Sequence, residues 1–357
     1  MMASTYIIAE AGVNHNGSIK LARELVEKAA DIGADAIKFQ SFKSEDVVIP
    51  SSPKADYQKQ SSPESKTQYD LLKSLELSKD AFLELRDLCR KHKIDFLCTP
   101  FSFDSLIFLL EIGIKTIKFS SGDLTYGPLL LKAAQSRCRV FLSTGMADES
   151  EIEQALAVLA FGYSHPNKTP NSLAEILKFY TSQDSEEILK EKVVVLHCTS
   201  EYPAPFDQIN LNVLDKMQEK FSTRVGYSDH SPGILVPSLA VAKGATVIEK
   251  HITLDRNMSG PDHAASLDIQ QFSEMIQQIR LTETILGVSD KRPTPAELKN
   301  KPVVRRGLYA GEEIQKGQRF SNENMKALRP EGTRSPMMYW DVLGEIAERS
   351  YEELEKI

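Results

Sequence analysis

The chain has 357 residues, 41% of them hydrophobic, with a formal net charge of -7 and a pI near 5.7. This length allows one large domain with a small one, or two of medium size. The acidic balance argues against a nucleic-acid partner, and the apolar runs are too short to span a bilayer. An anionic substrate would therefore have to be held by a local cluster of donors.

The N-terminal residues and the cysteines of the chain are typical of a protein in a reducing compartment. Residues 1–12 have neither a basic start nor a sustained apolar run, so we expect no signal peptide. Cys89, Cys98, Cys138 and Cys198 form no C-x-x-C pair and no disulfide framework. We therefore expect a cytoplasmic location.

Short β-rich runs alternate with longer amphipathic stretches along most of the chain. Helical spacing of apolar residues is clear at 19–34, 78–93 and 148–160. The predicted strands are residues 6–9, 36–40, 96–99, 116–120, 140–144, 193–197, 224–228 and 246–251. Eight strand-then-helix units predict an α/β fold of the (β/α)₈ TIM-barrel type over residues 1–287. A doubly wound open sheet is the alternative, weakened because no G-x-G-x-x-G follows the first strand.

One segment interrupts the alternation. Residues 161–191 are too long for an ordinary connection, although 173–182 within them read as helical. We interpret the segment as an insertion on the barrel surface, which would serve as a mobile loop or an oligomer contact.

The composition changes after residue 287. Residues 288–302 are rich in proline and charge and are typical of a linker. Residues 303–357 contain strand-like pieces at 307–310 and 312–321 and read as a small second domain, which would lean on the barrel or on a partner chain. The single tryptophan, Trp340, is expected in its core.

Polar side chains gather at the carboxyl ends of the predicted strands, where barrel enzymes keep their chemistry. In chain order these residues are Glu10, Lys38, Gln40, Thr99, Lys118, Ser120, Ser121, Asp123, Ser143, Thr144, His197, Ser200, Glu201, Tyr202, Ser228, Asp229, His230, Glu249, His251 and Asp262.

Two consecutive apolar runs finish in a histidine: His230 closely follows the predicted strand 224–228, and His251 ends the predicted strand 246–251. If these strands are adjacent, both imidazoles lie at one rim of the barrel and could bind one divalent metal, leaving positions open for water and substrate. The alternative is a pair of hydrogen-bonded structural histidines. His15 and His197 are further candidates.

Lysines and a carboxylate accompany the histidines. Lys38 and Lys118 could be phosphate or carboxylate donors, and Lys118 could instead be a Schiff-base nucleophile; lysines that simply reach solvent are the alternative. With the nearby hydroxyls they would make a phosphate cradle. Glu10 is either a catalytic acid/base or the ion-pair partner of a lysine. Asp262 either belongs to the site or forms a turn.

The ordered motifs of the chain resemble those of the sialic acid synthase family. They are "AEAGVNHNG", "IKFQSFK", "CTPF", "IKFSSGD", "LSTGM", "LHCTSEYPAPF", "GYSDH", "IEKHITLD" and "GPDHAAS". The C-terminal "VVRRGLYAGEEIQKGQRFSNENMKALRPEGTRSP" resembles that family's antifreeze-like (SAF, β-clip) domain. Everything except the 161–191 insertion is covered.

This resemblance implies a (β/α)₈ barrel followed by a small β-rich SAF domain, in a domain-swapped homodimer where each SAF domain caps the partner's barrel. The implied reaction joins phosphoenolpyruvate to the open-chain aldehyde of a 2-acetamido hexose, giving a nine-carbon 2-keto sugar acid and phosphate. The implied metal is Mn²⁺, with Mg²⁺ or Co²⁺ as substitutes.

Residue roles also follow from the resemblance. The metal-binding histidines match His230 and His251, and Glu10 matches the proposed acid/base. Lys38 resembles a further donor near phosphoenolpyruvate, so that Glu10, Lys38 and Lys118 are the catalytic candidates. Positions that hold phosphoenolpyruvate match Lys118, Ser121, Ser143, Ser200 and Ser228. Sugar-contacting positions match Gln40, Asp123, Tyr202, Asp262 and Arg329, the last reaching across the dimer to the acetamido group.

The sugar itself is left open. Asp123 stands where family members often have glutamate, and Ser200 where sialic-acid-forming members often have asparagine. The first hypothesis is an N-acetylneuraminate synthase that uses N-acetylmannosamine. The second is an N,N'-diacetyllegionaminate synthase that uses 2,4-diacetamido-2,4,6-trideoxymannose, and a pseudaminate synthase ranks below both.

Other classes remain as alternatives. A related phosphoenolpyruvate-dependent synthase with a phosphorylated aldose would need a second arginine cluster, which the sequence lacks. A Schiff-base aldolase built on Lys118 would need no metal. A carbohydrate-binding or ice-binding protein would not need Glu10, Lys118 and the histidine pair at one barrel mouth.

Overall fold

The structure is a computed structural model that describes residues 4–63, 65–221 and 223–357. The chain divides into two compact units, Met1–Gly287 and Val288–Ile357, each described here by itself. The start of the N-terminal stretch considered above, residues 1–3, lies outside the described residues.

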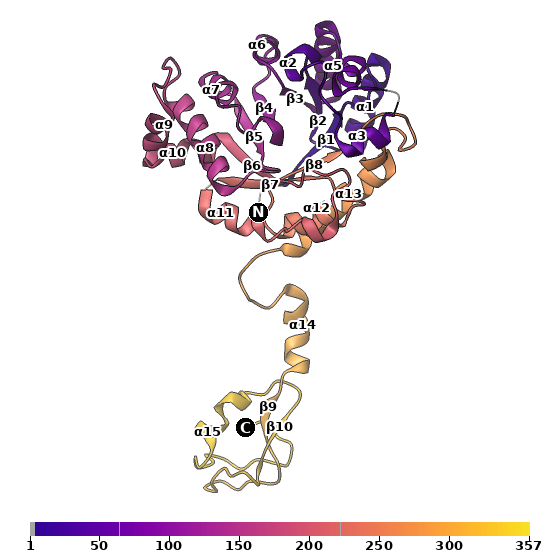
Figure 1. The fold of residues 1–357 in the computed structure, drawn as a ribbon. Helices are drawn as coiled ribbons and strands as arrows, with labels where there is room; N and C mark the ends of the chain where they lie inside the picture. The colour runs from indigo at the N-terminus through magenta and orange to yellow at the C-terminus, as the bar shows by residue number, and fades with distance from the viewer. Residues whose placement is uncertain (1–3, 64, 222) are drawn as a thin grey trace. The chain divides into compact units, whose positions relative to one another are not determined.

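The first unit is a closed barrel of eight parallel strands in sequential order, and β8 pairs with β1 to close it (Figure 1). The strands are β1 (Tyr6–Gly12), β2 (Ala36–Ser41), β3 (Asp95–Pro100), β4 (Thr116–Phe119), β5 (Arg139–Ser143), β6 (Val193–His197), β7 (Arg224–Asp229) and β8 (Val247–His251). The predicted barrel and all eight predicted strands are confirmed, with small differences at strand ends. The doubly wound alternative is excluded.

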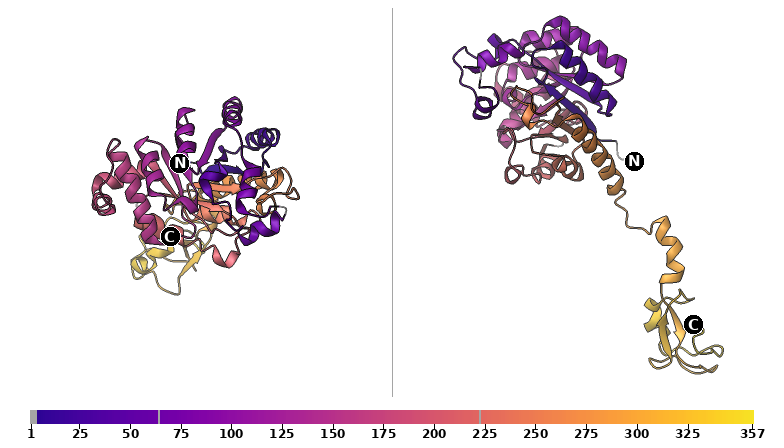
Figure 2. Two further views of the ribbon diagram at one scale, coloured as in Figure 1. Left: turned by 45° about the horizontal axis from the view of Figure 1, so that its top comes forward. Right: turned by 90° about the vertical axis from the view of Figure 1, so that its right-hand side faces the viewer.

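Helices surround the strands, and Figure 2 shows this outer layer from two further sides. In the described part of the unit they are α1 (Ile19–Asp31), α2 (Ser44–Val47), α3 (Asp56–Ser61), α4 (Gln68–Leu75), α5 (Lys79–His92), α6 (Phe103–Glu111), α7 (Gly127–Gln135), α8 (Glu149–Ser164), α9 (Leu173–Tyr180), α10 (Gln183–Lys192), α11 (Val213–Phe221), α12 (Leu235–Ala242) and α13 (Ile269–Leu286). Side-chain caps begin several of them: Ser78 accepts from the Ala81 amide and Asp148 from the Glu151 amide.

Strand alternation explains why the site forms where it does. Ile8, Leu97, Phe141, Leu196 and Val247 pack together as an apolar cluster separate from the larger core between strands and helices. In a strand, every second residue faces the same side. Two positions after Ile8, Leu97, Phe141 and Val247, the inward-facing residues are Glu10, Thr99, Ser143 and Glu249. The apolar cluster therefore lies beneath a polar barrel mouth.

The 161–191 segment is helical. Helix α8 continues through Ser164, and α9 and α10 pack against it (Figure 1). Helix α9 was expected from the sequence, whereas α10 was not. The segment is thus a helical addition to the outside of the barrel at α8.

The second unit contains α14 (Pro295–Val304), α15 (Tyr339–Val342), and an antiparallel pair, β9 (Gly307–Ala310) and β10 (Met325–Leu328). Isolated bridges add Ile314 to Tyr351 and Arg319 to Ile346, so the strand-like 312–321 segment does not form a named strand. Helix α14 begins inside the predicted linker. The core of the second unit is a small apolar cluster made of Leu308, Ala310, Ile314, Phe320, Met325, Val342, Ala347 and Ile357. The expectation for Trp340 was wrong, because its side chain is 72% exposed.

Candidate active site

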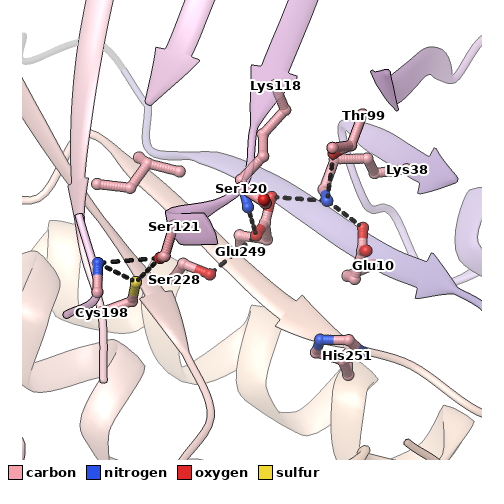
Figure 3. Close-up of polar contacts among 12 residues, drawn as sticks. Glu10, Lys38, Thr99, Lys118, Ser120, Ser121, Cys198, Ser228, Glu249 and His251 are labelled. Atoms are coloured by element: carbon pink, nitrogen blue, oxygen red, sulfur yellow. Dashed lines mark hydrogen bonds and ion pairs between the residues drawn. The ribbon is translucent and has the colours of Figure 1, made fainter. Parts of the chain in front are cut away.

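Four buried charged residues form an ion-pair network in the barrel mouth: Glu10, Lys38, Lys118 and Glu249 (Figure 3). Lys38 Nζ lies 2.6 Å from Glu10 Oε2 and 3.5 Å from Glu249 Oε2, while Lys118 Nζ lies 3.1 Å from Glu249 Oε1. Ser228 Oγ donates to Glu249 Oε1 at 2.8 Å. Burial of unpaired charge is costly, so each member depends on the others.

The two carboxylates of this network occupy different electrostatic environments. Burial raises the pKa of Glu10, and the Lys38 ammonium offsets this rise only in part. Burial also acts to raise the pKa of Glu249, but the flanking Lys118 and Lys38 ammonium groups and the Ser228 hydroxyl lower it overall. Two carboxylates with diverging pKa values are the arrangement that divides acid/base chemistry from charge stabilisation.

Glu10 is held from a second side by Gln40, whose Nε2 donates to Glu10 Oε1 at 3.2 Å. The β1–β2 register is irregular between Glu10 and Gly12, and Gly12 has φ of +53°. A Cβ at Gly12 would lie 3.1 Å from Glu10 Oε1 and 3.5 Å from His251 Cε1. The bare backbone of Gly12 therefore lets the carboxylate and the imidazole share this corner.

A second group of donors surrounds Gly145, just after β5. Its amide donates to Ser121 Oγ at 2.9 Å and to Cys198 Sγ at 3.2 Å, and a Cβ here would lie 2.2 Å from Ser200 Oγ. Ser143 is 1% exposed, and its Oγ has no hydrogen-bond partner within the described residues. Hydroxyls and a backbone amide gathered around a glycine can hold an anion.

The histidine group comprises His230, His251, Tyr202 and Asp262. The two imidazole centroids lie 5.8 Å apart, and the Tyr202 ring centroid lies 4.1 Å from that of His230. His230 Nδ1 pairs with the Thr199 carbonyl oxygen at 2.6 Å. Burial lowers the pKa of His230 to about 4, and burial and then His230 lower the pKa of His251 well below its usual value. Both rings are therefore neutral at pH 7.

The histidine pair fits a divalent metal in its donor chemistry. His251 Nδ1 is buried, has no hydrogen-bond partner in the described part of the chain, and lies 3.8 Å from Asp262 Oδ2. A neutral imidazole with an open lone pair is a metal ligand. Among the described residues no group of three or more His, Cys, Asp or Glu is arranged for a metal, so further ligands would come from water or substrate.

The remaining predicted sugar residues are placed unevenly. Asp262 is buried close to His251, and burial, then the Glu10 charge, raise its pKa to about 7. Asp123 is held by Ser120, whose Oγ donates to it at 2.6 Å, and burial raises its pKa. Arg329 directly follows β10 in the second unit, so its predicted contact with the sugar stays a prediction.

Several residues that shape the site have no role predicted from the sequence. Glu249 and Thr99 are predicted only to lie at strand ends, yet Glu249 contacts both lysines, and Thr99 Oγ1 accepts from Lys38 Nζ at 3.3 Å. Gly12, Gly145 and Cys198 carried no distinctive signal. Strand alternation does contain a signal for Glu249: it lies two positions after Val247 on the same strand, so it must face the inside of the barrel as Val247 does.

The Lys118 ion pair bears on the Schiff-base alternative. A Schiff base requires a neutral amine as the nucleophile. Lys118 Nζ instead lies 3.1 Å from Glu249 Oε1 in a buried ion pair, and this contact helps to lower the pKa of Glu249. The geometry therefore favours an anion-binding role.

Known proteins share both the sequence and the fold. The NeuB family profile matches residues 25–291. The chain is 42% identical to the N,N'-diacetyllegionaminic acid synthase of Campylobacter jejuni, covering 100% of this chain and 99% of that protein. It is 41% identical to the Legionella pneumophila enzyme of the same name, covering 95% of this chain and 89% of that one.

A solved structure agrees. The N-acetylneuraminic acid synthetase of Leptospira borgpetersenii is 33% identical, with a TM-score of 0.68, over 84% of this chain and 90% of that one. No helix in the described part of the present chain has the length and apolar character needed to cross a membrane. The chain thus belongs to the NeuB family and is a phosphoenolpyruvate-dependent, carbon–carbon bond-forming enzyme of the sialic acid synthase type.

Proposed function

We propose that the chain is an N,N'-diacetyllegionaminate synthase that condenses phosphoenolpyruvate with the open-chain aldehyde of 2,4-diacetamido-2,4,6-trideoxymannose. The observation that carries this choice is the 42% and 41% identity to two legionaminic acid synthases over nearly the whole chain, against 33% to the N-acetylneuraminic acid synthetase. The second of our sequence hypotheses is thereby better supported than the first.

The ion-pair network and the Gly145 donors support the phosphoenolpyruvate site. Inward-facing hydroxyls and a buried lysine suit a ligand with a carboxylate and a phosphate. We assign the binding residues as Lys118, Ser121, Ser143, Ser200 and Ser228. Ser143 Oγ, without a partner among the described residues, is a donor available to such a ligand.

Charge balance supports a cation in the same site. The two lysines of the network are matched by two buried carboxylates, so these four residues contribute no net positive charge. A phosphoenolpyruvate anion would then enter without full compensation. A divalent metal at His230 and His251, Mn²⁺ by preference or Mg²⁺ or Co²⁺, would offset this charge and supply Lewis acidity toward the aldehyde oxygen.

The chemistry assigned to the chain's own residues follows from their positions. The methylene carbon of phosphoenolpyruvate bonds to the aldehyde carbon, and the aldehyde oxygen gains a proton from solvent. Water then adds to the carbon that bears the phosphate ester, and Glu10, whose pKa is raised, takes the proton of that water. As the ketone forms, the C–O bond to phosphate breaks and the remaining hydroxyl proton leaves with the phosphate. Lys38 and Lys118 stabilise the departing phosphate.

The sugar would lie over the histidine group, with Gln40, Asp123, Tyr202 and Asp262 in reach of its polar groups. We further propose that the second unit is an antifreeze-like domain, and that the enzyme is a domain-swapped homodimer in which Arg329 binds the acetamido group of the partner's substrate. A cytoplasmic location completes the proposal, and the four buried cysteines without disulfides support it.

The test is phosphate release from phosphoenolpyruvate in the presence of Mn²⁺, comparing 2,4-diacetamido-2,4,6-trideoxymannose with N-acetylmannosamine. A clear preference for the diacetamido sugar is expected. Preference for N-acetylmannosamine would make the enzyme an N-acetylneuraminate synthase. Resistance to EDTA together with borohydride trapping on Lys118 would restore the aldolase alternative, and no release with any sugar would favour a binding protein.

A further inference from the structure

A buried ion pair lies directly before the two histidines. Asp229 precedes His230, Lys250 precedes His251, and β7–β8 pairing places Asp229 opposite Lys250. Each of the two charged residues is 1% exposed. Because side chains alternate along a strand, Asp229 and Lys250 face the helical layer while the histidines face the barrel mouth.

The pair fixes the backbone around His230 from both sides. The Lys250 ammonium donates to the Asp229 carboxylate, and also to the carbonyl oxygen of Ser231 at 2.7 Å. Asp229 Oδ1 accepts from the Ser231 amide at 2.9 Å. His230 therefore sits between two residues that are both tied to Lys250, the neighbour of His251.

Other strands use apolar residues at comparable outward positions. Phe119 ends β4 and Leu142 lies near the end of β5, and both are buried in the core between strands and helices. A buried ion pair contributes less to stability than well-packed apolar residues of similar volume. The charged pair thus occurs on the two strands that carry the histidines. There the exact placement of the two imidazoles matters more than the stability gained by burying apolar side chains.

We propose that Asp229 and Lys250 are positioning residues that fix the relative placement of His230 and His251 and thereby set the affinity of the site for a divalent cation. This inference rests on the metal site of the proposed function. Groups that hold metal ligands in place from behind commonly affect metal affinity about 10–100-fold. The anion donors around Gly145 come from other strands and do not contact this pair.

The experiment measures Mn²⁺ binding to the full-length chain by calorimetry and by the manganese EPR signal, with phosphoenolpyruvate binding measured separately without metal. The main variant is the double substitution Asp229→Asn/Lys250→Met, which leaves no unpaired buried charge. We expect its Kd for Mn²⁺ to rise about 10–100-fold. Its Kd for phosphoenolpyruvate should stay within about twofold of wild type.

A matched control separates positioning from general destabilisation. Val195→Ala removes a fully buried side chain that packs in the outer core from β6, so it lowers stability without touching the pair. Its Mn²⁺ affinity should equal that of wild type. If the double variant does not fold, Asp229→Asn/Lys250→Gln is measured. It keeps a hydrogen-bonding side chain at both positions and leaves no unpaired buried charge, so a smaller loss of Mn²⁺ affinity is expected.

The outcomes distinguish the two levels of inference. Wild-type Mn²⁺ affinity in a folded pair variant would overturn the positioning role while leaving the metal site intact. If His251→Ala binds Mn²⁺ as wild type does, or wild type binds none, the histidine site itself is wrong and the positioning role is overturned with it. Loss of affinity in the pair variant and in His251→Ala, but not in Val195→Ala, supports both.

Discussion

The ion-pair network and the histidine group occupy the same barrel mouth but are built on opposite electrostatic rules. In the network each buried charge has an opposite charge within 3.5 Å, so its side chains are held in place before any ligand arrives. In the histidine group the imidazoles are neutral, and His251 Nδ1 has no hydrogen-bond partner among the residues described. One half is preorganised for an anion, and the other is completed by its ligands.

His251→Ala should have the largest effect. It removes one of the two histidines proposed to bind the metal, and the histidine group depends on that metal to complete it. Lewis-acid assistance contributes several kcal/mol to such reactions, so we expect kcat/KM to fall about 10³-fold. Added Mn²⁺ should not restore activity. The matched control is His197→Gln, at another histidine that ends a strand; His197 is half-buried, and its Nε2 pairs with the Ile209 carbonyl oxygen at 2.7 Å.

The control should lose less than about tenfold, since His197 is outside the proposed metal site and loses only one neutral hydrogen bond. Full activity in His251→Ala, measured by phosphate release, would remove the metal assignment. Equal losses in both variants would show that the histidines act through barrel packing.

Glu10→Gln and Glu249→Gln test whether the network itself divides into two functions. Glu10→Gln removes the proposed proton acceptor and should lower kcat at least about 10²-fold. It should lower the free energy of unfolding less than Glu249→Gln does, because Lys38 keeps Glu249 as a partner. Glu249→Gln leaves two buried lysines short of a counter-charge and should chiefly lower the free energy of unfolding, by about 3–5 kcal/mol. Steady-state kinetics and thermal unfolding measure both, and interchanged outcomes would contradict the division.

The fold was predictable because strand periodicity and helix caps are local properties of the sequence. The same reasoning placed Lys38, Lys118 and both histidines at one rim, since parallel strands end together. It could not say which lysine meets which carboxylate. That depends on the register between β1, β2 and β8, where Glu10 lies opposite both Lys38 and His251.

The features missed by the sequence analysis depend on contacts between distant segments. Lys250 looked like an ordinary strand residue because its partner, Asp229, lies on another strand. Gly145 became informative only when Ser121 and Ser200, from separate loops, converged on it. Helix α10 has a charged sequence with few apolar positions, so its helical character was weak in the pattern.

Arg329→Ala extends the comparison to the second unit, which supplies the one sugar contact proposed from outside the barrel. We expect the KM for the sugar to rise about tenfold, the value of one charged hydrogen bond, with the KM for phosphoenolpyruvate nearly unchanged. Arg292→Ala, at an exposed position in the second unit, is the control. A parallel rise in both KM values would place Arg329 outside the sugar site.

Glu76→Gln should have the smallest effect, because it removes a carboxylate–lysine contact near the surface. Glu76 accepts from the Ser44 amide at 2.9 Å and hydroxyl at 2.7 Å, and lies 3.0 Å from Lys43 Nζ, whose side chain is 51% exposed. Although burial opposes it, Ser44 and the lysines lower the pKa of Glu76 to about 2. Solvent screening keeps such a contribution to about 1 kcal/mol.

A carboxylate with a lowered pKa in the folded state stabilises it above the unfolded pKa, near 4.5, and this stabilisation is lost as the pH falls toward 2. Glu76→Gln should therefore lower Tm by about 2–4 °C at pH 7, and the gap to wild type should close between pH 4.5 and pH 2. Glu24→Gln, an exposed helix position, should show no gap. A gap that persists unchanged at low pH would mean that Glu76 acts through packing and not through its charge.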